Sequence, residues 1–342
     1  MRARLRLALA VVRPAVVTLV VLSAVAGVAQ GGGAVGLGRL GLLAVAVVGS
    51  LACAVAVNDL SDEAIDRVNL GHDPGRLLVA GSHRRQLAAV AAVAAGLALA
   101  AAGLLGLRAA LLVLGALALA AAYSLRPVRL ADRGVVAPLL LPLGYVAVPY
   151  LLGVLAARDH LVAGDLALLG GLYAGFVGRI VLKDLRDVRG DALFGKRTFL
   201  VRHGRVATCR LSAAGWLVGL AVLPAIRGAT PVLVASWVVL TGLALVLLRG
   251  LAAAGGARRD EAIVGGLALC GRGVVVLVVA HLTLVDAGWA PAGAASVLVA
   301  VAATTVGQVL SMVRHGPRSG LVLDPAVAGA AGSAGARVTA PG

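Results

Sequence analysis

Ten apolar runs, most of them about 20 residues long, constrain this chain more than any other feature of its sequence. A run of that length matches the ~30 Å hydrocarbon layer of a bilayer. Hydrophobic residues make up 61% of the chain and charged residues only 13%, which is more apolar surface than a water-soluble core can enclose. The runs cover residues 9–29, 39–58, 87–106, 108–124, 134–156, 162–182, 206–226, 230–250, 262–285 and 289–313.

The runs are continuous in Ala, Val and Leu and do not alternate between apolar and polar residues. Alternation is typical of a membrane β-barrel, whereas continuous runs indicate membrane helices. Because every backbone N–H and C=O in the hydrocarbon layer needs an internal partner, we predict an all-α, polytopic transmembrane bundle. The short break at residues 106–108 leaves the count at nine to ten spans.

Basic residues are concentrated in alternate loops, and the net charge is +16. No nucleic-acid motif accompanies this charge, so we expect no nucleic-acid partner. Cytoplasmic loops carry the excess of Lys and Arg in membrane proteins. We therefore predict an integral protein of the cell membrane with both termini in the cytoplasm. The enriched loops contain Arg2 to Arg13, Arg67 to Arg85, Arg126 to Arg133, residues 183–205, Arg258, Arg259, Arg314 and Arg318, against Arg39, Arg108, Arg158 and Arg227 in the opposite loops.

The two ends of the chain differ in character. The first run follows three arginines and is open to interpretation as a secretory signal. We favour an uncleaved span, because the run is long and Pro14 suits a helix start. We expect residues 1–316 to form one transmembrane domain, and residues 317–342, rich in Gly, Ala and Pro, to form a disordered cytoplasmic tail. The isolated Cys53, Cys209 and Cys270 are interpreted as small core residues.

Two aspartate clusters share the pattern D-x-x-D-x-x-x-D. They are Asp59, Asp62 and Asp66 at the end of the second run, and Asp184, Asp187 and Asp191 at the end of the sixth. Both end even-numbered runs and so belong to the same, cytoplasmic face. The spacing of i, i+3 and i+7 places all three carboxylates of a cluster on one face of a helix. The two clusters have the same spacing and end runs that are four apart along the chain, which hints at an internal duplication.

Such clusters are unfavourable without a counter-ion. They stand at helix C-termini, where the macrodipole disfavours acids, and like charges at i+3 and i+4 repel. The plain alternative is a set of solvated, helix-ending acids. However, the chain has only 15 acidic residues and places six of them here. Carboxylate oxygens without His or thiolate suit Mg²⁺, which favours phosphate oxygens as further ligands. We predict that the six aspartates hold Mg²⁺ ions bridged by a diphosphate.

Basic and aromatic residues near the clusters are candidates for substrate binding. Lys183 and Arg76, and with lower expectation Arg126 and Arg129, lie in the same cytoplasmic segments and can bind diphosphate oxygens. Tyr173 and Phe176 precede Asp184 at helical spacing, and we expect both to point into the cavity below it. Their alternative role is ordinary helix packing. An aromatic face there can stabilise a developing allylic cation.

Two arginines stand inside apolar runs, Arg179 in the sixth and Arg272 in the ninth. A charge at the bilayer centre costs about 2.5–3.5 kcal/mol on insertion scales. Such residues usually face the protein interior, although Arg179 is near enough to its run's end to snorkel.

The motifs and the loops around them resemble the UbiA superfamily of intramembrane prenyltransferases. Asn58-Asp59 to Asp66 and Asp184 to Asp191 are similar to its paired acidic motifs. Further similar segments are Arg13-Pro14, Gly75 to Gly81, Tyr123-Ser124-Leu-Arg-Pro127-x-Arg129-Leu130 and Phe194 to Thr198. The chain departs from the pattern at Leu77, where Pro is usual, and at Ala131, where Lys is usual.

The resemblance implies helices around a central cavity, Mg²⁺, a prenyl diphosphate donor and a lipophilic, usually aromatic acceptor. It also implies metal-diphosphate roles for Asn58 and the six aspartates, and a place near the donor for Tyr123 and Ser124. The expected activity is prenyl transfer with release of diphosphate. Two alternatives remain: a terpene cyclase on the same scaffold, and a transporter. Transport sites usually lie near the midplane, whereas these clusters lie at helix ends.

Overall fold

The computed structural model describes residues 14–64, 84–134, 136–185, 198–222, 226–253 and 256–316. Within these residues every element is helical, and each of the ten predicted runs holds a helix. The α-helices are α2 (Pro14–Gly31), α3 (Leu37–Ser61), α5 (Arg84–Leu105), α6 (Leu107–Ser124), α7 (Val136–Pro142), α8 (Val148–Ala157), α9 (Ala163–Ile180), α11 (Phe199–Ala221), α12 (Pro231–Ala252), α13 (Ala257–Asp286) and α14 (Pro291–His315). Shorter turns are η1 (Leu130–Asp132), η2 (Leu143–Ala147) and η3 (Val181–Lys183).

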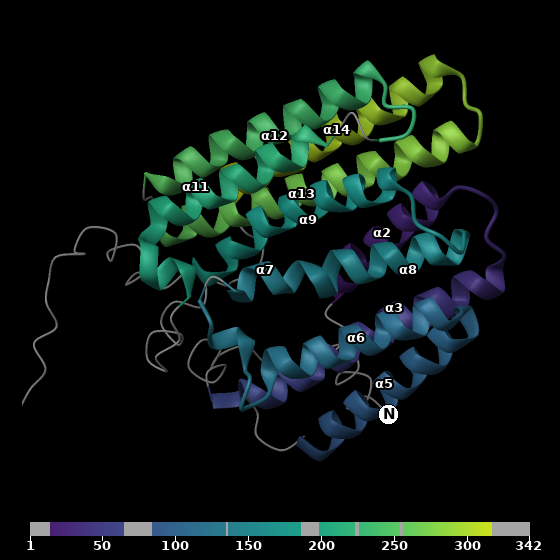
Figure 1. Cartoon of the computed structure of the whole chain (residues 1–342). Helices are drawn as coiled ribbons and strands as arrows, with labels where there is room; N and C mark the ends of the chain where they lie inside the picture. Colours follow the sequence, from purple (N-terminus) through teal and green to yellow (C-terminus); the bar gives the residue numbers. More distant parts are fainter. Residues whose placement is uncertain are drawn as a thin grey trace, which may run out of the picture.

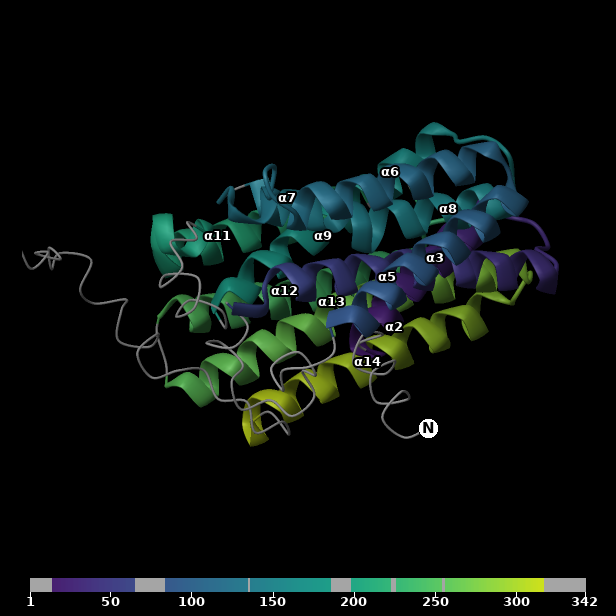
Figure 2. The ribbon, with the colours of Figure 1, turned by 90° about the horizontal axis from the view of Figure 1, so that it is seen from below.

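The helices run roughly along one direction, as Figures 1 and 2 show. α3, α5 and α6 pack together on one side, and α11 to α14 on the other, with α2, α8 and α9 between them (Figure 1). Eight helical segments of the described chain are long and apolar enough to cross a membrane, and Val16–Gly31 is a shorter apolar helix. The all-α membrane fold is confirmed, whereas the exact span count stays a prediction.

Two apolar cores hold the bundle together, one centred on α3 and α5 and the other on α9 and α11 to α14. α2 and α8 belong to both cores and approach each other closely. A Cβ atom at Gly27 would overlap the carbonyl oxygen of Tyr150, and one at Gly153 would overlap that of Ala24. Small residues replace the hydrophobic effect as the means of helix association in lipid, because they let the backbones come close.

The helix containing α7 and α8 is continuous but widens into a π turn at η2. Pro149 has no N–H and cannot donate to the carbonyl of Tyr145 four residues earlier. Val148 N instead donates to the carbonyl of Leu143, five residues back. The wider turn rotates the residues of η2 relative to those of α7 and α8.

The three cysteines are free and buried, as predicted. The predicted tail at residues 317–342 lies outside the described residues, as do the first 13 residues.

Candidate functional site

A cavity of about 400 Å³ lies between the two cores. Its wall comes from α2, α3, α6, the helix of α7, η2 and α8, α9 and α13. Most of the lining is aliphatic, and the polar side chains are few. They are Ser50, Asn58, Asp62, Tyr123, Ser124, Tyr145, Arg179, Lys183 and Arg272. Six of the predicted site residues therefore share one cavity: Asn58, Asp62, Tyr123, Ser124, Phe176 and Lys183.

The first acidic motif lies where α3 ends. The helix ends at Ser61, and Asp62 follows with φ −98° and ψ 10°, outside the helical range. Its amide nitrogen donates to the carbonyl of Asn58 over 2.9 Å, and the Asn58 side-chain amide donates to the Asp62 carboxylate over 3.0 Å. Asn58 and Asp62 thus form one polar unit on the cavity wall.

The predicted alignment of three carboxylates on one helix face stays a prediction, because Asp66 lies outside the described residues. Asp62 is 8% exposed and lines the cavity, whereas Asp59 is half-buried and is not part of the cavity wall. One residue along a helix turns the side chain by about 100°, so Asp59 cannot share the direction of Asn58.

Arg129 connects the first motif to the segment that follows α6. Its guanidinium lies 2.6 Å from the Asp62 carboxylate and 2.7 Å from that of Asp132, and it donates to the Ser61 carbonyl over 3.3 Å. The backbone at Arg129 is left-handed, with φ 34° and ψ 65°, which is uncommon for a residue other than glycine. The sequence places Arg129 near the cluster but does not reveal this direct contact. Arg126 is exposed.

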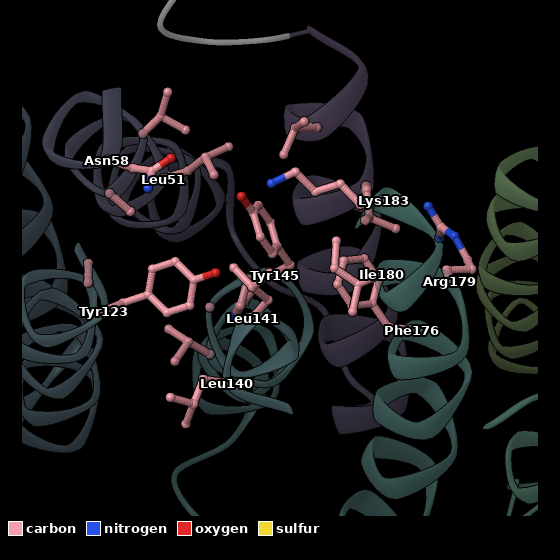
Figure 3. Close-up of a pocket in the computed structure, with 18 of the residues that line it drawn as sticks. Leu51, Asn58, Tyr123, Leu140, Leu141, Tyr145, Phe176, Arg179, Ile180 and Lys183 are labelled. Carbon is pink, nitrogen blue, oxygen red and sulfur yellow. The ribbon is translucent and has the colours of Figure 1, made fainter. Parts of the chain in front are cut away.

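The second motif begins where α9 tightens into the 3₁₀ turn η3. Lys183 ends that turn and reaches into the cavity, while Asp184 beside it is half-buried and lies off the wall. In Figure 3 the Lys183 amine, the Tyr123 hydroxyl and Asn58 face the same space. Tyr123 lies within electrostatic range of Lys183, Asp62 and Asp184. The ends of the two motif helices therefore meet at one end of the cavity.

Two aromatic rings form part of the wall beside this polar end. Phe176 of α9 and Tyr145 of η2 have ring centroids 5.6 Å apart, a separation typical of interacting aromatic pairs. Figure 3 shows the Tyr145 hydroxyl directed toward the polar end. Tyr145 is not among the residues predicted from the sequence. The feature that could have indicated it is its position, because it is a rare aromatic residue between Pro142 and Pro149 within an apolar run.

The prediction that Tyr173 points into the cavity is wrong. Its hydroxyl donates to the carbonyl of Leu139 on α7, and the residue does not line the cavity. Three residues along a helix turn the side chain by about 300°, so Tyr173 is rotated by about 60° from Phe176. That rotation directs it at α7, where it packs against the adjoining core.

Four predicted site residues, Asp66, Arg76, Asp187 and Asp191, lie outside the described residues. Among the described ones, no three His, Cys, Asp or Glu side chains gather as a metal site. The acidic donors that remain, Asp59, Asp62 and Asp184, supply hard oxygen ligands without nitrogen or sulfur, which suits Mg²⁺. These carboxylates fit a metal whose other ligands come from substrate oxygens and water. Metal binding by the six aspartates stays a prediction.

The model of the UbiA prenyltransferase family matches residues 19–263 of the chain. Two curated proteins are similar over about half of it. The bacteriochlorophyll synthase 34 kDa chain of Chloroflexus aurantiacus is 30% identical over 179 residues, which is 51% of this chain and 56% of that protein. The digeranylgeranylglyceryl phosphate synthase of Pyrococcus abyssi is 33% identical over 178 residues, or 51% and 60%. The chain thus matches less than two thirds of each relative's length.

Solved structures share the fold. A UbiA homolog from Aeropyrum pernix K1 superposes with a TM-score of 0.61 at 19% identity, covering 80% of this chain and 98% of that one. A UbiA homolog from Archaeoglobus fulgidus bound to GPP and Mg²⁺ gives 0.57 at 15% identity, covering 90% and 99%. At these identities the likeness supports the helical arrangement, and the site must be argued from its own residues.

Proposed function

The chain belongs to the UbiA prenyltransferase family, and from that premise we propose that it transfers a prenyl group from a prenyl diphosphate to a lipophilic, aromatic acceptor. The observation that supports this proposal is that the described starts of both acidic motifs, Asn58 to Asp62 and Lys183-Asp184, lie at one end of an apolar cavity within a membrane bundle. The relatives support it, because two are named as synthases and a structural neighbour is described with GPP and Mg²⁺.

The diphosphate of the donor belongs at the polar end. Lys183 offers a cation, and Asn58, Tyr123 and Ser124 offer hydrogen-bond donors around the same space. The aspartates of the two motifs carry the opposite charge, and we propose that they hold the diphosphate through Mg²⁺. When bound, Mg²⁺ supplies positive charge that stabilises the departing diphosphate. Arg76 is proposed as a further diphosphate ligand.

The isoprenoid chain belongs against the apolar wall, which Leu51, Leu119, Leu140, Leu141 and Leu152 help to form. The rings of Phe176 and Tyr145 belong to the cavity wall beside the polar end. Aromatic faces attract cations, so the two rings are suited to stabilise positive charge on the allylic carbon as its bond to oxygen breaks. Burial of the reacting carbon also keeps water away from it.

The reaction balances without an oxidant or reductant. The C–O bond of the donor breaks, and its electron pair leaves with the diphosphate oxygen. A bond then forms from a nucleophilic atom of the acceptor to the allylic carbon, and the acceptor loses a proton. Lys183 is placed to offset the negative charge on the leaving diphosphate.

We propose that the polar end of the cavity faces the cytoplasm. The support is the distribution of Arg and Lys, which are concentrated in the loops on the side of the two motifs. Both termini then lie on that side.

The test is a reaction with the purified protein in lipid nanodiscs, Mg²⁺ and prenyl diphosphates of several lengths, with a lipid-soluble extract as the source of acceptors. Mass spectrometry should detect a prenylated product that requires both Mg²⁺ and the extract. A cyclic hydrocarbon or alcohol formed without the extract would instead identify a cyclase. Solute uptake into vesicles that persists in Asp62→Ala and Asp187→Ala would favour a transporter.

A further inference from the structure

Two arginines line the cavity from facing helices, Arg179 on α9 and Arg272 on α13. Their positive charges lie close enough to repel each other. Within the described chain neither forms an ion pair with a carboxylate, and the Arg179 Nε atom is buried without a hydrogen-bond partner. Arg272 stands near the middle of the 30-residue helix α13, so its position is deep in the bundle.

The pair is separate from the polar end of the cavity. Arg179 lies one helical turn before Lys183, and Figure 3 shows the two side chains directed to opposite sides of α9. The Arg179 guanidinium lies over the Phe176 ring, with its carbon 5.3 Å from the ring centroid. Phe176 therefore contacts this second basic group as well as the Tyr145 ring.

α13 is shaped to accept Arg179. A Cβ atom at Gly271 would overlap the Cδ atom of Arg179, so only glycine leaves room for the side chain at this contact. Val264, Ala268 and Arg272 recur at four-residue spacing along α13 and present one face to the cavity. The guanidinium of Arg179 thus lies against α13 immediately beside Arg272.

Two cations in a medium of low polarity repel strongly, and an isolated buried charge is unfavourable. A bound anion removes both penalties. Guanidinium groups bind planar or tetrahedral oxyanions through paired N–H donors, so carboxylate and phosphate are the groups they fit best.

We propose that Arg179 and Arg272 form an anion subsite that binds an acidic group, a carboxylate or a phosphate monoester, on the lipophilic acceptor. The acceptor role rests on the proposed function, whereas anion binding itself does not. With its acidic group held there, an acceptor extends past Phe176 toward the reacting end of the donor. The acidic group then selects which lipophilic molecules react.

The test uses probes that differ only in the head group: 2-naphthoate, 2-naphthyl phosphate and the uncharged naphthalene-2-carboxamide. Binding to the purified full chain in detergent is measured by equilibrium dialysis with fluorescence detection. At least one anion should bind roughly tenfold or more tightly than the carboxamide, because charged hydrogen bonds are lost with the latter. The preferred anion distinguishes a carboxylate from a phosphate acceptor.

Arg179→Gln and Arg272→Gln should each weaken binding of that anion roughly tenfold or more. Arg179→Lys and Arg272→Lys should retain part of the affinity, and Gly271→Ala should weaken it by displacing Arg179. The matched control is Arg249→Gln, since Arg249 is exposed at the end of α12 and away from the cavity. Size-exclusion profiles and melting temperatures identify the variants that fold. If a Gln variant does not fold, the Arg→Lys variants and Gly271→Ala provide the test instead.

Binding of geranyl diphosphate with Mg²⁺ separates this subsite from the proposed reaction. Asp62→Asn should weaken geranyl diphosphate binding and leave the naphthyl anion unaffected, while the arginine variants should show the reverse. If the unmodified protein binds the anion but not geranyl diphosphate, the proposed function is contradicted and the anion subsite is supported. Equal binding of all three probes would overturn the subsite, as would equal losses of both ligands in the arginine variants.

Discussion

The guanidinium of Arg129 lies 2.6 Å from the carboxylate of Asp62, and both side chains are largely buried. The contact ties the segment after α6 to the end of α3, which are 67 residues apart in the chain. It also holds Asp62 beside Asn58 at the cavity wall. Arg129 is therefore a positioning residue for the first acidic motif, although the sequence alone ranks it below Lys183.

Arg129→Gln should lower kcat/KM for the prenyl diphosphate by about 10- to 100-fold, because a charge-assisted contact worth about 1.5–3 kcal/mol is lost. The Mg²⁺ concentration for half-maximal rate should also rise, since Asp62 is no longer held in place. Steady-state kinetics at varied Mg²⁺ measures both. Arg133→Gln is the control, because Arg133 is exposed nearby. Similar rates and Mg²⁺ requirements in both variants would refute the positioning role.

Tyr123→Phe and Tyr173→Phe should behave differently, although each removes one hydroxyl. The Tyr123 hydroxyl faces the proposed diphosphate site, so its loss should raise KM for the donor by about two- to tenfold. The Tyr173 hydroxyl bonds to Leu139 outside the cavity, so its loss should leave KM unchanged. Donor titrations at saturating Mg²⁺ distinguish the two. A larger effect at Tyr173 would restore the interpretation that it contacts substrate.

A buried ion pair between Arg205 of α11 and Asp260 of α13 should contribute to stability. The two groups lie 2.7 Å apart with side chains 6% and 3% exposed, and the Arg205 Nε atom also donates to the carbonyl of Leu251 on α12. Asp260→Asn should destabilise the protein by about 3–5 kcal/mol, because an unpaired charge remains buried. Thermal unfolding in detergent measures the loss. Arg205→Met combined with Asp260→Leu should recover much of this stability. A double variant that loses as much stability as the single variants Arg205→Met and Asp260→Leu added together would contradict this reasoning.

The contact of α2 with α8 should not tolerate a side chain at Gly27. Gly27→Leu would force the helices apart at the Tyr150 carbonyl, and overpacking of this kind costs about 1–3 kcal/mol or more. Gly41→Leu is the matched control, because a Cβ atom at Gly41 meets no atom within 4 Å. The melting temperature should fall for the first variant and stay near that of the unmodified protein for the second. Equal melting temperatures would mean that the two helices are less tightly packed.

The apolar runs predict nearly the whole fold, because a membrane helix is defined by its composition and length. They also bring Asn58, Tyr123, Ser124, Phe176 and Lys183 to one site, since helix ends on the same face must converge in a bundle. What the sequence does not predict depends on local departures from ideal helix geometry. α3 ends at Ser61, and Asp62 just beyond it lines the cavity whereas Asp59 does not. The π turn that carries Tyr145 and the left-handed backbone of Arg129 likewise leave no periodic signal.

The most direct test of the central claim, that the two acidic motifs form one diphosphate site, is Mg²⁺-dependent diphosphate release by Asp62→Asn, Asp184→Asn and the double variant. Asp159→Asn, in the exposed loop before α9, serves as the control. Each single variant should lose at least about 100-fold in rate, and the double variant should lose little more, because residues that act as one unit are not additive. Rates within a few-fold of the unmodified protein in both single variants would contradict the claim.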